Sequence, residues 1–306
     1  MVKIVFGGFS LSDQAYFKIL EERNQAVNLL LKNGVNNIDT AHIYPGSEYG
    51  VGQLEKRKEF TIDTKLPGGS IPGSITKDGV IKYLQESLRR LQIDHIDVLY
   101  IHTPDDSVPI EQTLEGINEA YKKGAFRRFG LSNYTAKQVQ EVYDIAKAKG
   151  YLLLQTELPS TLRKLSINFY AYSAIAGGFL TRSIADLDAG IGRFNKNVMG
   201  GLFSMLYDHE HLRKALFTWN YIARKEGVSN AELAYRWVAY HSALHGDEDG
   251  ILLGVSKLSQ IEQTIQGIKK GKLSDEAVKA IEVVWENIKR HPPVDRHFEF
   301  QNGGSG

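Results

Sequence analysis

The chain has 306 residues, of which 42% are hydrophobic and 24% charged, and its formal net charge is +1. These proportions are typical of a globular protein, and the length suits one α/β barrel domain. The near-zero net charge gives no reason to expect a nucleic-acid partner or binding to an anionic membrane. Cysteine is absent, which excludes disulfides, thiolate metal ligands and a cysteine nucleophile.

We expect no signal peptide and no membrane-spanning segment in this chain. The N-terminus, MVKIVFGGFSLSDQ, lacks the long apolar core of a signal peptide. The longest nearly apolar run, Phe169 to Leu180, is too short to span a bilayer. We therefore expect a cytoplasmic protein that makes no membrane contact. Residues 1–300 are predicted to form a single domain, and residues 301–306, which end in GGSG, a flexible tail.

Short apolar, β-branched runs alternate with amphipathic helical segments along the chain. The predicted strands are Lys3–Gly8, Asn37–Thr40, Phe60–Lys65, Ile96–His102, Arg128–Asn133, Ile167–Ser173 and Gly250–Val255. Their nearly continuous apolar character is typical of parallel strands that are buried on both faces.

The helices between these strands have recognisable ends. One is predicted to begin at Thr76, with an apolar stripe of Val80, Leu84, Leu88 and Leu91. The next has Pro109 near its first turn and Gly124 after its last. Capping-box spacing occurs at Thr135 with Gln138, Ser229 with Glu232, and Ser259 with Glu262. A last helix is predicted from about Ser274 to Arg290, before two prolines.

Strand–helix alternation of this length is compatible with a barrel or with an open doubly wound sheet. An open nucleotide-binding sheet should carry G-x-G-x-x-G after its first strand. Here the first strand is followed by Gly7-Gly8-Phe9 and no such pattern. The sequence therefore predicts an α/β protein with a (β/α)₈ TIM barrel.

Polar or ionisable residues follow the apolar bodies of six predicted strands. They are Asp39-Thr40, Lys65, His102, Ser132-Asn133, Tyr172-Ser173 and Ser256-Lys257. Because the active site of such a barrel forms at the carboxyl ends of its strands, we expect these side chains to converge on one polar floor.

This set of residues suits the reduction of an aldehyde or ketone, which needs a hydride donor and an acid that protonates the developing alkoxide. A tyrosine can be that acid when a nearby cation lowers its pKa. Tyr44, five residues after Asp39 in IDTAHIY, is the candidate acid, Lys65 the cation, and Asp39 the group that holds the ammonium. His102 could orient the carbonyl oxygen.

Nine histidines raise the question of a metal site. The one close pair, His209-Glu210-His211, places two histidines two residues apart, which directs them to different faces of a helix. Since the strand ends show no cluster of histidines and carboxylates with the spacing of zinc ligands, we predict no metal site.

These residues, with the stretches around them, resemble a known family. The stretches VNNIDTAHIY, FTIDTKLPGG, HIDVLYIHTPD, FGLSNYTAKQV, FYAYSAIAGGFLT and ILLGVSKLSQIEQ, in this order, resemble the aldo-keto reductases. The closest likeness is to fungal members related to the aflatoxin-aldehyde reductases, and it extends from about Val2 to Val294. The combination of Asp-Thr-Ala-x-x-Tyr, a strand-end lysine, a strand-end histidine and Gly-Leu-Ser-Asn is highly specific.

The resemblance implies a role for each matching residue. Asp39, Tyr44, Lys65 and His102 match the catalytic tetrad of the family. The implied contacts to the cofactor are Ser132 and Asn133 with the nicotinamide carboxamide, Tyr172 with the nicotinamide face, Gly177, Gly178 and Leu180 with the pyrophosphate, and Ser256, Lys257 and Gln260 with the adenosine 2′-phosphate. The last group implies NADPH rather than NADH, and phosphate sites of barrels do lie after the last two strands.

The chain departs from the family pattern between Gly150 and Leu162, where the family has a sixth strand and its loop. The segment GYLLLQTELPSTLRKL is short by most of a strand. Either Tyr151–Gln155 forms a shortened sixth strand, with Gln155 as a further carboxamide ligand, or the strand is missing and the neighbouring strands five and seven expose edge backbone.

The sequence thus predicts an NADPH-dependent enzyme that reduces a small-molecule carbonyl substrate, as a monomer or homodimer. The shortened sixth strand leaves two alternatives. One is a cofactor-binding regulatory module, like the potassium-channel β subunits that share this fold, and the other is an inactive truncated isoform.

Overall fold

The computed structural model describes residues 1–151 and 168–290. The chain forms two compact units. Residues 2–172 and 245–263 make the first, which we call the sheet unit, and residues 173–244 with those from 264 onward make the second, the helical unit. Gln155 and the tail 301–306 lie outside the described residues, so the predictions for them remain predictions, as does the single domain over 1–300.

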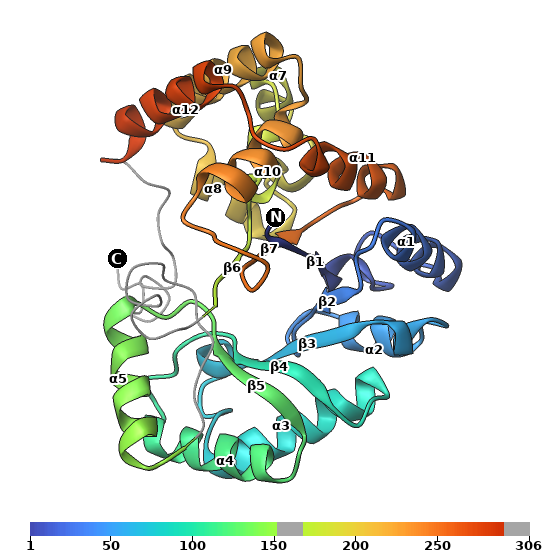
Figure 1. The fold of residues 1–306 in the computed structure, drawn as a ribbon, viewed down its shortest axis with the longest axis vertical. Coiled ribbons are helices and arrows are strands. Elements are labelled where there is room, and N and C mark those ends of the chain that lie inside the picture. Colours follow the sequence, from blue (N-terminus) through green and yellow to red (C-terminus); the bar gives the residue numbers. More distant parts are fainter. Residues whose placement is uncertain (152–167, 291–306) are drawn as a thin grey trace. The chain divides into compact units, whose positions relative to one another are not determined.

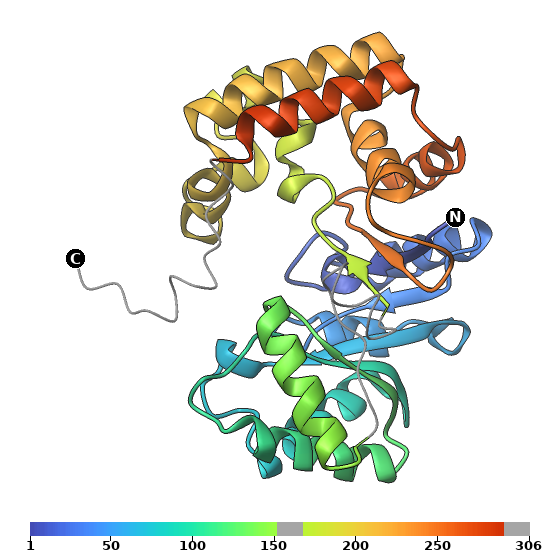
Figure 2. The same ribbon diagram turned by 60° about the vertical axis from the view of Figure 1, so that its left-hand side comes forward.

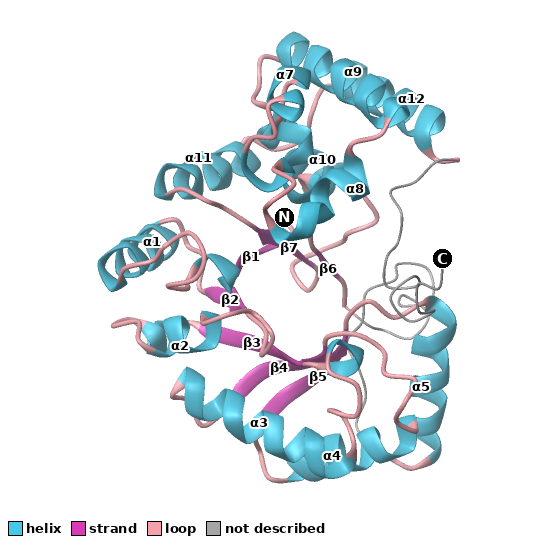
Figure 3. Ribbon diagram, turned by 180° about the vertical axis from the view of Figure 1, so that it is seen from behind, coloured by secondary structure: helices cyan, strands magenta, loops and turns pink. Residues whose placement is uncertain are grey.

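The sheet unit contains seven parallel strands in the order β5-β4-β3-β2-β1-β7-β6. Their bounds are β1 Lys3–Gly7, β2 Asn37–Asp39, β3 Thr61–Leu66, β4 Ile96–Ile101, β5 Phe126–Leu131, β6 Tyr170–Ala171 and β7 Gly250–Leu253. The sheet is visibly curved (Figure 1, Figure 3). This arrangement confirms the predicted barrel class, with the strands predicted as seventh and eighth observed as β6 and β7.

Two strand predictions differ most from the structure, and the others differ by one or two residues at an end. The fifth strand was expected at Arg128–Asn133 but runs from Phe126 to Leu131, because Asn133 has a left-handed backbone, with φ 61°, that a strand cannot contain. The next described strand was expected at Ile167–Ser173 and comprises only Tyr170 and Ala171. Ser173 likewise has φ 56°, which ends the extended conformation.

Five helices follow strands of the sheet unit: α1 Leu20–Lys32, α2 Ser47–Gly52, α3 Lys77–Leu91, α4 Ile110–Lys122 and α5 Ala136–Ala148. The predicted stripe of α3 is confirmed, since Val80, Leu84 and Leu91 are buried and Leu88 is partly buried against the same cluster. That cluster fills the space between α3–α5 and the outer side chains of β4 and β5, among them Leu99 and Leu131.

Three of the predicted helix caps are confirmed. The Thr76 and Ser229 hydroxyls accept from the backbone N–H groups of Gly79 and Glu232, and Thr135 forms a reciprocal capping box with Gln138. The cap predicted at Ser259 is wrong, because α11 (Leu258–Lys269) begins one residue earlier. There the side-chain oxygen of Gln260 accepts from the N–H groups of Ser256 and Lys257 and satisfies the start of the helix instead.

The helical unit consists of a 3₁₀ segment η4 (Ala176–Thr181) and the helices α7 Ile184–Asp188, α8 Leu202–Tyr207, α9 Glu210–Glu226, α10 Asn230–His241 and α12 Asp275–Ile288. The long helices α9 and α12 lie side by side (Figure 2). Trp219 and Ile222 of α9 are buried with Leu233 of α10 and Ile281 of α12. In residues 1–151 and 168–290, no helix has the length and apolar character needed to cross a bilayer.

Strands β5 and β6 lie at the two ends of the strand order. Among the described residues their backbones do not pair, but side chains make contacts between them. The Tyr170 hydroxyl of β6 lies within the electrostatic influence of Arg128 of β5, which works against the rise in the pKa of Tyr170 that burial causes. The Tyr172 hydroxyl donates to Oδ1 of Asn133 at 2.7 Å, and Phe169 packs against the cluster under β5. The edges therefore meet through side chains, and whether residues 152–167 contribute a strand lies outside the described residues.

Candidate active site

The carboxyl ends of β2 and β3 place a buried ion pair at one edge of the sheet. Lys65 Nζ donates to Asp39 Oδ2 at 2.5 Å and to the carbonyl oxygen of Thr40 at 2.8 Å. Asp39 and Lys65 are 3% and 6% exposed. Burial raises the pKa of the Asp39 carboxyl, and the Lys65 ammonium opposes this increase. The Asp39 carboxylate and the Thr40 carbonyl oxygen thus fix the position of the ammonium, so that its charge can act on a neighbouring group.

Tyr44 lies in the loop after β2 and faces this cation. Lys65 Nζ is 5.8 Å from the centroid of the Tyr44 ring. The His102 ring, which follows β4, makes an edge contact with the Tyr44 ring at a centroid distance of 5.4 Å, and Phe9 makes another at 5.4 Å. The structure therefore brings together all four residues that we predicted as catalytic, from three strand ends and one loop.

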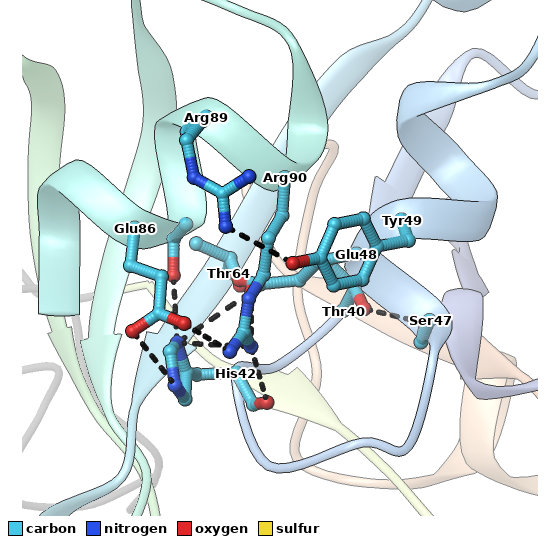
Figure 4. Close-up of polar contacts among 10 residues, drawn as sticks. Thr40, His42, Ser47, Glu48, Tyr49, Thr64, Glu86, Arg89 and Arg90 are labelled. Atoms are coloured by element: carbon cyan, nitrogen blue, oxygen red, sulfur yellow. Dashed lines mark hydrogen bonds and ion pairs between the residues drawn. The ribbon is translucent and has the colours of Figure 1, made fainter.

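A network of buried polar contacts holds the loop that carries Tyr44 (Figure 4). His42, two residues before Tyr44, hydrogen-bonds through Nδ1 to the Ser87 hydroxyl of α3 at 3.2 Å and lies 3.6 Å from Glu48 Oε2 of α2. The Glu48 carboxylate also accepts from the Thr64 hydroxyl of β3 at 2.7 Å and pairs with Arg90 of α3 at 3.4 Å. The loop is consequently attached to a strand and two helices.

The same network explains two shifted ionisations. Burial, reinforced by the charge of Arg90, lowers the pKa of His42 to about 4. Burial raises the pKa of Glu48, although hydrogen bonds from Ser87, Thr64 and Arg90 oppose it. At neutral pH His42 is therefore an uncharged imidazole beside the loop.

A second tyrosine, Tyr49, lies near this segment, but its hydroxyl contacts a different cation. Its hydroxyl accepts from Arg89 of α3 at 3.0 Å (Figure 4), and the side chain is 46% exposed. The bond from Arg89 lowers the pKa of Tyr49. Tyr49 therefore lies on the surface between α2 and α3, and its hydroxyl is engaged there.

The residues predicted to hold the nicotinamide carboxamide lie at the end of β5. Ser132 is buried, and its hydroxyl accepts from Asn133 Nδ2 at 3.1 Å. Asn133 Nδ2 also donates to the carbonyl oxygen of His102 at 2.8 Å, so this amide is joined to the backbone of a candidate catalytic residue. Tyr172, 51% exposed, meets the same amide through its hydroxyl.

The residues predicted to hold a phosphate lie after β7, where α11 begins. Ser256 and Lys257 are exposed, and Gln260 binds their backbone N–H groups. An exposed hydroxyl and an ammonium at the N-terminus of a twelve-residue helix suit an anionic group.

The remaining predicted contacts lie in the helical unit. Gly177 and Gly178 in η4 have φ of 64° and 103°, and Leu180 follows them. A side-chain carbon at Gly177 would approach the Phe203 ring to 2.1 Å. The local chain thus requires glycine there for its own packing, and the pyrophosphate contact remains a prediction.

Two residues of the sheet unit near this edge were not singled out from the sequence. Tyr100 of β4 lies with its ring centroid 5.4 Å from Lys65 Nζ, and Asp63 of β3 is fully buried beside Asp39. Asp63 was detectable, because it lies inside the predicted strand Phe60–Lys65 and two residues before Lys65, so strand alternation places its carboxylate on the same face as the proposed cation. Nothing in the sequence distinguished Tyr100 from the aromatic residues of an ordinary buried strand.

A curved parallel sheet with an ion pair, a tyrosine and a histidine at its carboxyl edge defines a barrel enzyme of the oxidoreductase type. Comparisons with known proteins are consistent with this class. The Aldo/keto reductase family model matches residues 3–286. Oxidoreductase sirO of Leptosphaeria maculans is 35% identical over 293 residues, 90% of this chain and 89% of its own length. Human aflatoxin B1 aldehyde reductase member 4 is 33% identical, covering 86% and 88%.

The structure of the glycerol dehydrogenase from Gluconobacter oxydans superposes with a TM-score of 0.69 over 95% of this chain and 93% of its own, at 23% identity, which shows the shared fold. The chain belongs to the aldo-keto reductase family and is one of its oxidoreductases.

Proposed function

We propose that this protein reduces aldehydes and ketones to alcohols with NADPH, and that Tyr44 is the general acid. The observation that carries the proposal is the position of Lys65 Nζ, held by Asp39 and Thr40 and 5.8 Å from the Tyr44 ring. An ammonium so close, in a site of low dielectric constant, stabilises a phenolate and lowers the pKa of the phenol. The printed names of the relatives, aldehyde reductases among them, support an aldehyde as substrate.

The residues present suit the cofactor. Ser132 and Asn133 supply hydroxyl and amide groups beside His102, and Ser256 and Lys257 supply a hydroxyl and a cation at a helix N-terminus. That cation supports a phosphorylated ribose, hence NADPH rather than NADH. Gly177, Gly178 and Leu180 are proposed for the pyrophosphate, Tyr172 for the nicotinamide ring and Gln260 for the 2′-phosphate end. NADPH, when bound, supplies the hydride that the carbonyl carbon accepts.

The chain's own residues would then orient the carbonyl oxygen and transfer a proton to it. The His102 ring next to Tyr44 would hydrogen-bond the carbonyl oxygen and hold it against the phenol. As negative charge develops on this oxygen, the Tyr44 hydroxyl transfers its proton to it. Lys65 stabilises the phenolate that remains, and Asp39 keeps the ammonium in position. Tyr44 recovers a proton from water before the next turnover.

The test is the loss of NADPH absorbance with a panel of nitrobenzaldehydes. Tyr44→Phe should lower kcat by about 100-fold or more, because it removes the acid and retains the ring. NADPH affinity, measured by fluorescence quenching, should change little. Tyr49→Phe is the matched control, since Tyr49 faces Arg89 on the surface, and it should behave as wild type.

Other outcomes would contradict the proposal. Folded wild-type protein that binds NADPH and reduces none of the aldehydes would indicate the regulatory cofactor-binding module. Protein that binds no NADPH would indicate the inactive isoform.

A further inference from the structure

A second carboxyl group, that of Asp63, lies next to the Asp39–Lys65 pair. Asp63 is on β3, and the parallel register places it opposite Asp39 of β2. It precedes Lys65 by two residues, so both side chains leave the same face of the strand. Asp63 is fully buried. The Asp39–Lys65 pair therefore has a buried acid as its immediate neighbour in the sheet.

The two oxygens of Asp63 differ in their surroundings. Oδ1 accepts a hydrogen bond from the backbone N–H of Val98 on β4 at 3.0 Å. Oδ2 has no hydrogen-bond partner among the residues that the structure describes. Lys65 donates to Asp39 Oδ2. A buried carboxylate with an oxygen that no donor reaches is costly, and the protonated acid is the less costly form.

Charged or titratable groups from five neighbouring strands act on Asp63. They are Lys3 of β1, Asp39 of β2, Asp97 of β4, Arg128 of β5 and Tyr170 of β6. Arg127 and Arg128 both bind the Asp97 carboxylate directly, so the negative charge of Asp97 offsets much of their positive charge. Burial, with the charges of Asp39 and Asp97, raises the pKa of Asp63 to about 7, against the influence of Arg128 and Val98.

We propose that Asp63 is a positioning residue that holds a proton beside the Asp39–Lys65 pair in mildly acidic solution, and that losing this proton as the pH rises weakens the effect of Lys65 on Tyr44. The second half rests on the proposed function. The step itself is a simple ionisation: the Asp63 O–H bond breaks, the proton goes to solvent and a carboxylate remains. That carboxylate adds a negative charge two residues from Lys65 and partly cancels the field of the ammonium at Tyr44.

The first experiment compares pH profiles of kcat/KM for carbonyl reduction in wild type and Asp63→Asn. Asparagine has the shape of the protonated acid, and its oxygen can still accept from Val98. Without a carboxylate at this position Lys65 acts on Tyr44 undiminished, so the Tyr44 phenol should ionise at lower pH. Because reduction needs the protonated phenol, the alkaline limb of the profile should move to lower pH in the variant. Superimposable profiles would overturn the coupling.

The second experiment needs no turnover. Infrared titration of the purified protein should show the carbonyl-stretch band of a buried carboxylic acid that disappears as the pH rises through about 7. The band should be absent in Asp63→Asn. It should persist in the control Asp105→Asn, whose carboxylate accepts from Gly73 and Ser107. Asp39→Asn should move the midpoint to lower pH, because it removes the adjacent negative charge.

The two experiments separate the two proposals. If wild type lacks the acid band, the inference about Asp63 is wrong whether or not the protein is a reductase. If the band titrates as described and the protein reduces no carbonyl, the proton on Asp63 is supported and the proposed function is contradicted.

Discussion

At Gly50 of α2, a side-chain carbon would stand 1.8 Å from the carbonyl oxygen of Leu11. A side-chain carbon at Gly52, the last residue of α2, would approach the carbonyl oxygen of Arg90 in the same way, at 2.1 Å. These contacts are with backbone, which cannot rotate away as a side chain can. They pack α2, which carries Glu48, against Leu11 and against the end of α3. At the residue scale, α2 can pack in this way only because positions 50 and 52 carry no side chain.

Gly50→Ala should therefore destabilise the protein by about 1–3 kcal/mol, the usual cost of forcing extra volume into a packed region. Urea denaturation followed by circular dichroism measures the change. Gly254→Ala is the control, since a side-chain carbon there meets no atom within 4 Å, and it should change the unfolding free energy by less than about 1 kcal/mol. Equal unfolding midpoints for the two variants would mean that the backbone contact at Gly50 is not restrictive.

At the element scale, helix α5 shows how local sequence defines the framework of the site. It follows Asn133 and begins with the capping box of Thr135 and Gln138. The Thr135 hydroxyl accepts from the Gln138 N–H at 3.3 Å, and the Gln138 side chain accepts from the Thr135 N–H at 2.9 Å. This start fixes where the β5 loop ends and therefore supports the backbone of Asn133.

Thr135→Ala should lower the unfolding free energy by about 1 kcal/mol, because the Gln138 N–H at the start of α5 loses the hydroxyl that accepts from it. Thr135→Ser should retain most of the stability. Thr218→Ala in α9 is a matched control, since that hydroxyl donates to the Lys214 carbonyl within the helix and caps nothing. The prediction fails in chemical denaturation if Thr135→Ala is no less stable than Thr218→Ala.

For the molecule as a whole, ionisable groups in its interior make stability depend on pH in opposing directions. His42 has a pKa lowered from 6.5 to about 4, so between these values the unfolded chain binds a proton that the folded protein does not. The stability that depends on neutral His42 is complete above pH 6.5 and is lost as the pH falls toward 4. Asp63, with its raised pKa, has the opposite effect: the stability it contributes is present at low pH and is lost as the pH rises through about 7.

Because these effects oppose each other in wild type, the informative quantity is the difference between wild type and His42→Gln. As the pH falls from 7 to 4, the unfolding free energy of wild type should decrease relative to that of His42→Gln by up to about 3 kcal/mol. Guanidinium unfolding at several pH values measures it. His95→Gln, at an exposed histidine that contacts the Gly124 carbonyl, is the control for the replacement of an imidazole by an amide. A difference curve for His42→Gln that is flat with pH would refute the buried neutral imidazole.

Strands with a continuous apolar body were predictable, because burial on both faces leaves a strong signal in composition. It was also predictable that Asp39, Tyr44, Lys65 and His102 meet, because each stands at, or shortly after, such a strand end. The start of α11 was not, since the adjacent residues Ser259 and Gln260 can both cap a helix, and only the folded backbone shows that the Gln260 side chain binds the N–H groups of Ser256 and Lys257. The two-residue length of β6 was also not predictable, because Ser173 can adopt extended or left-handed backbone and its neighbours decide.

The sequence by itself determined the parallel α/β class, the family and the four residues that meet at the carboxyl edge, because periodicity and strand ends are local properties of the chain. Only the tertiary structure decided that Lys65 donates to Asp39, that Asp63 lies opposite Asp39, and that side chains connect β5 with β6. These contacts join residues 24 or more positions apart. Their distances, and the burial that shifts their pKa values, exist only once the register of the sheet is set.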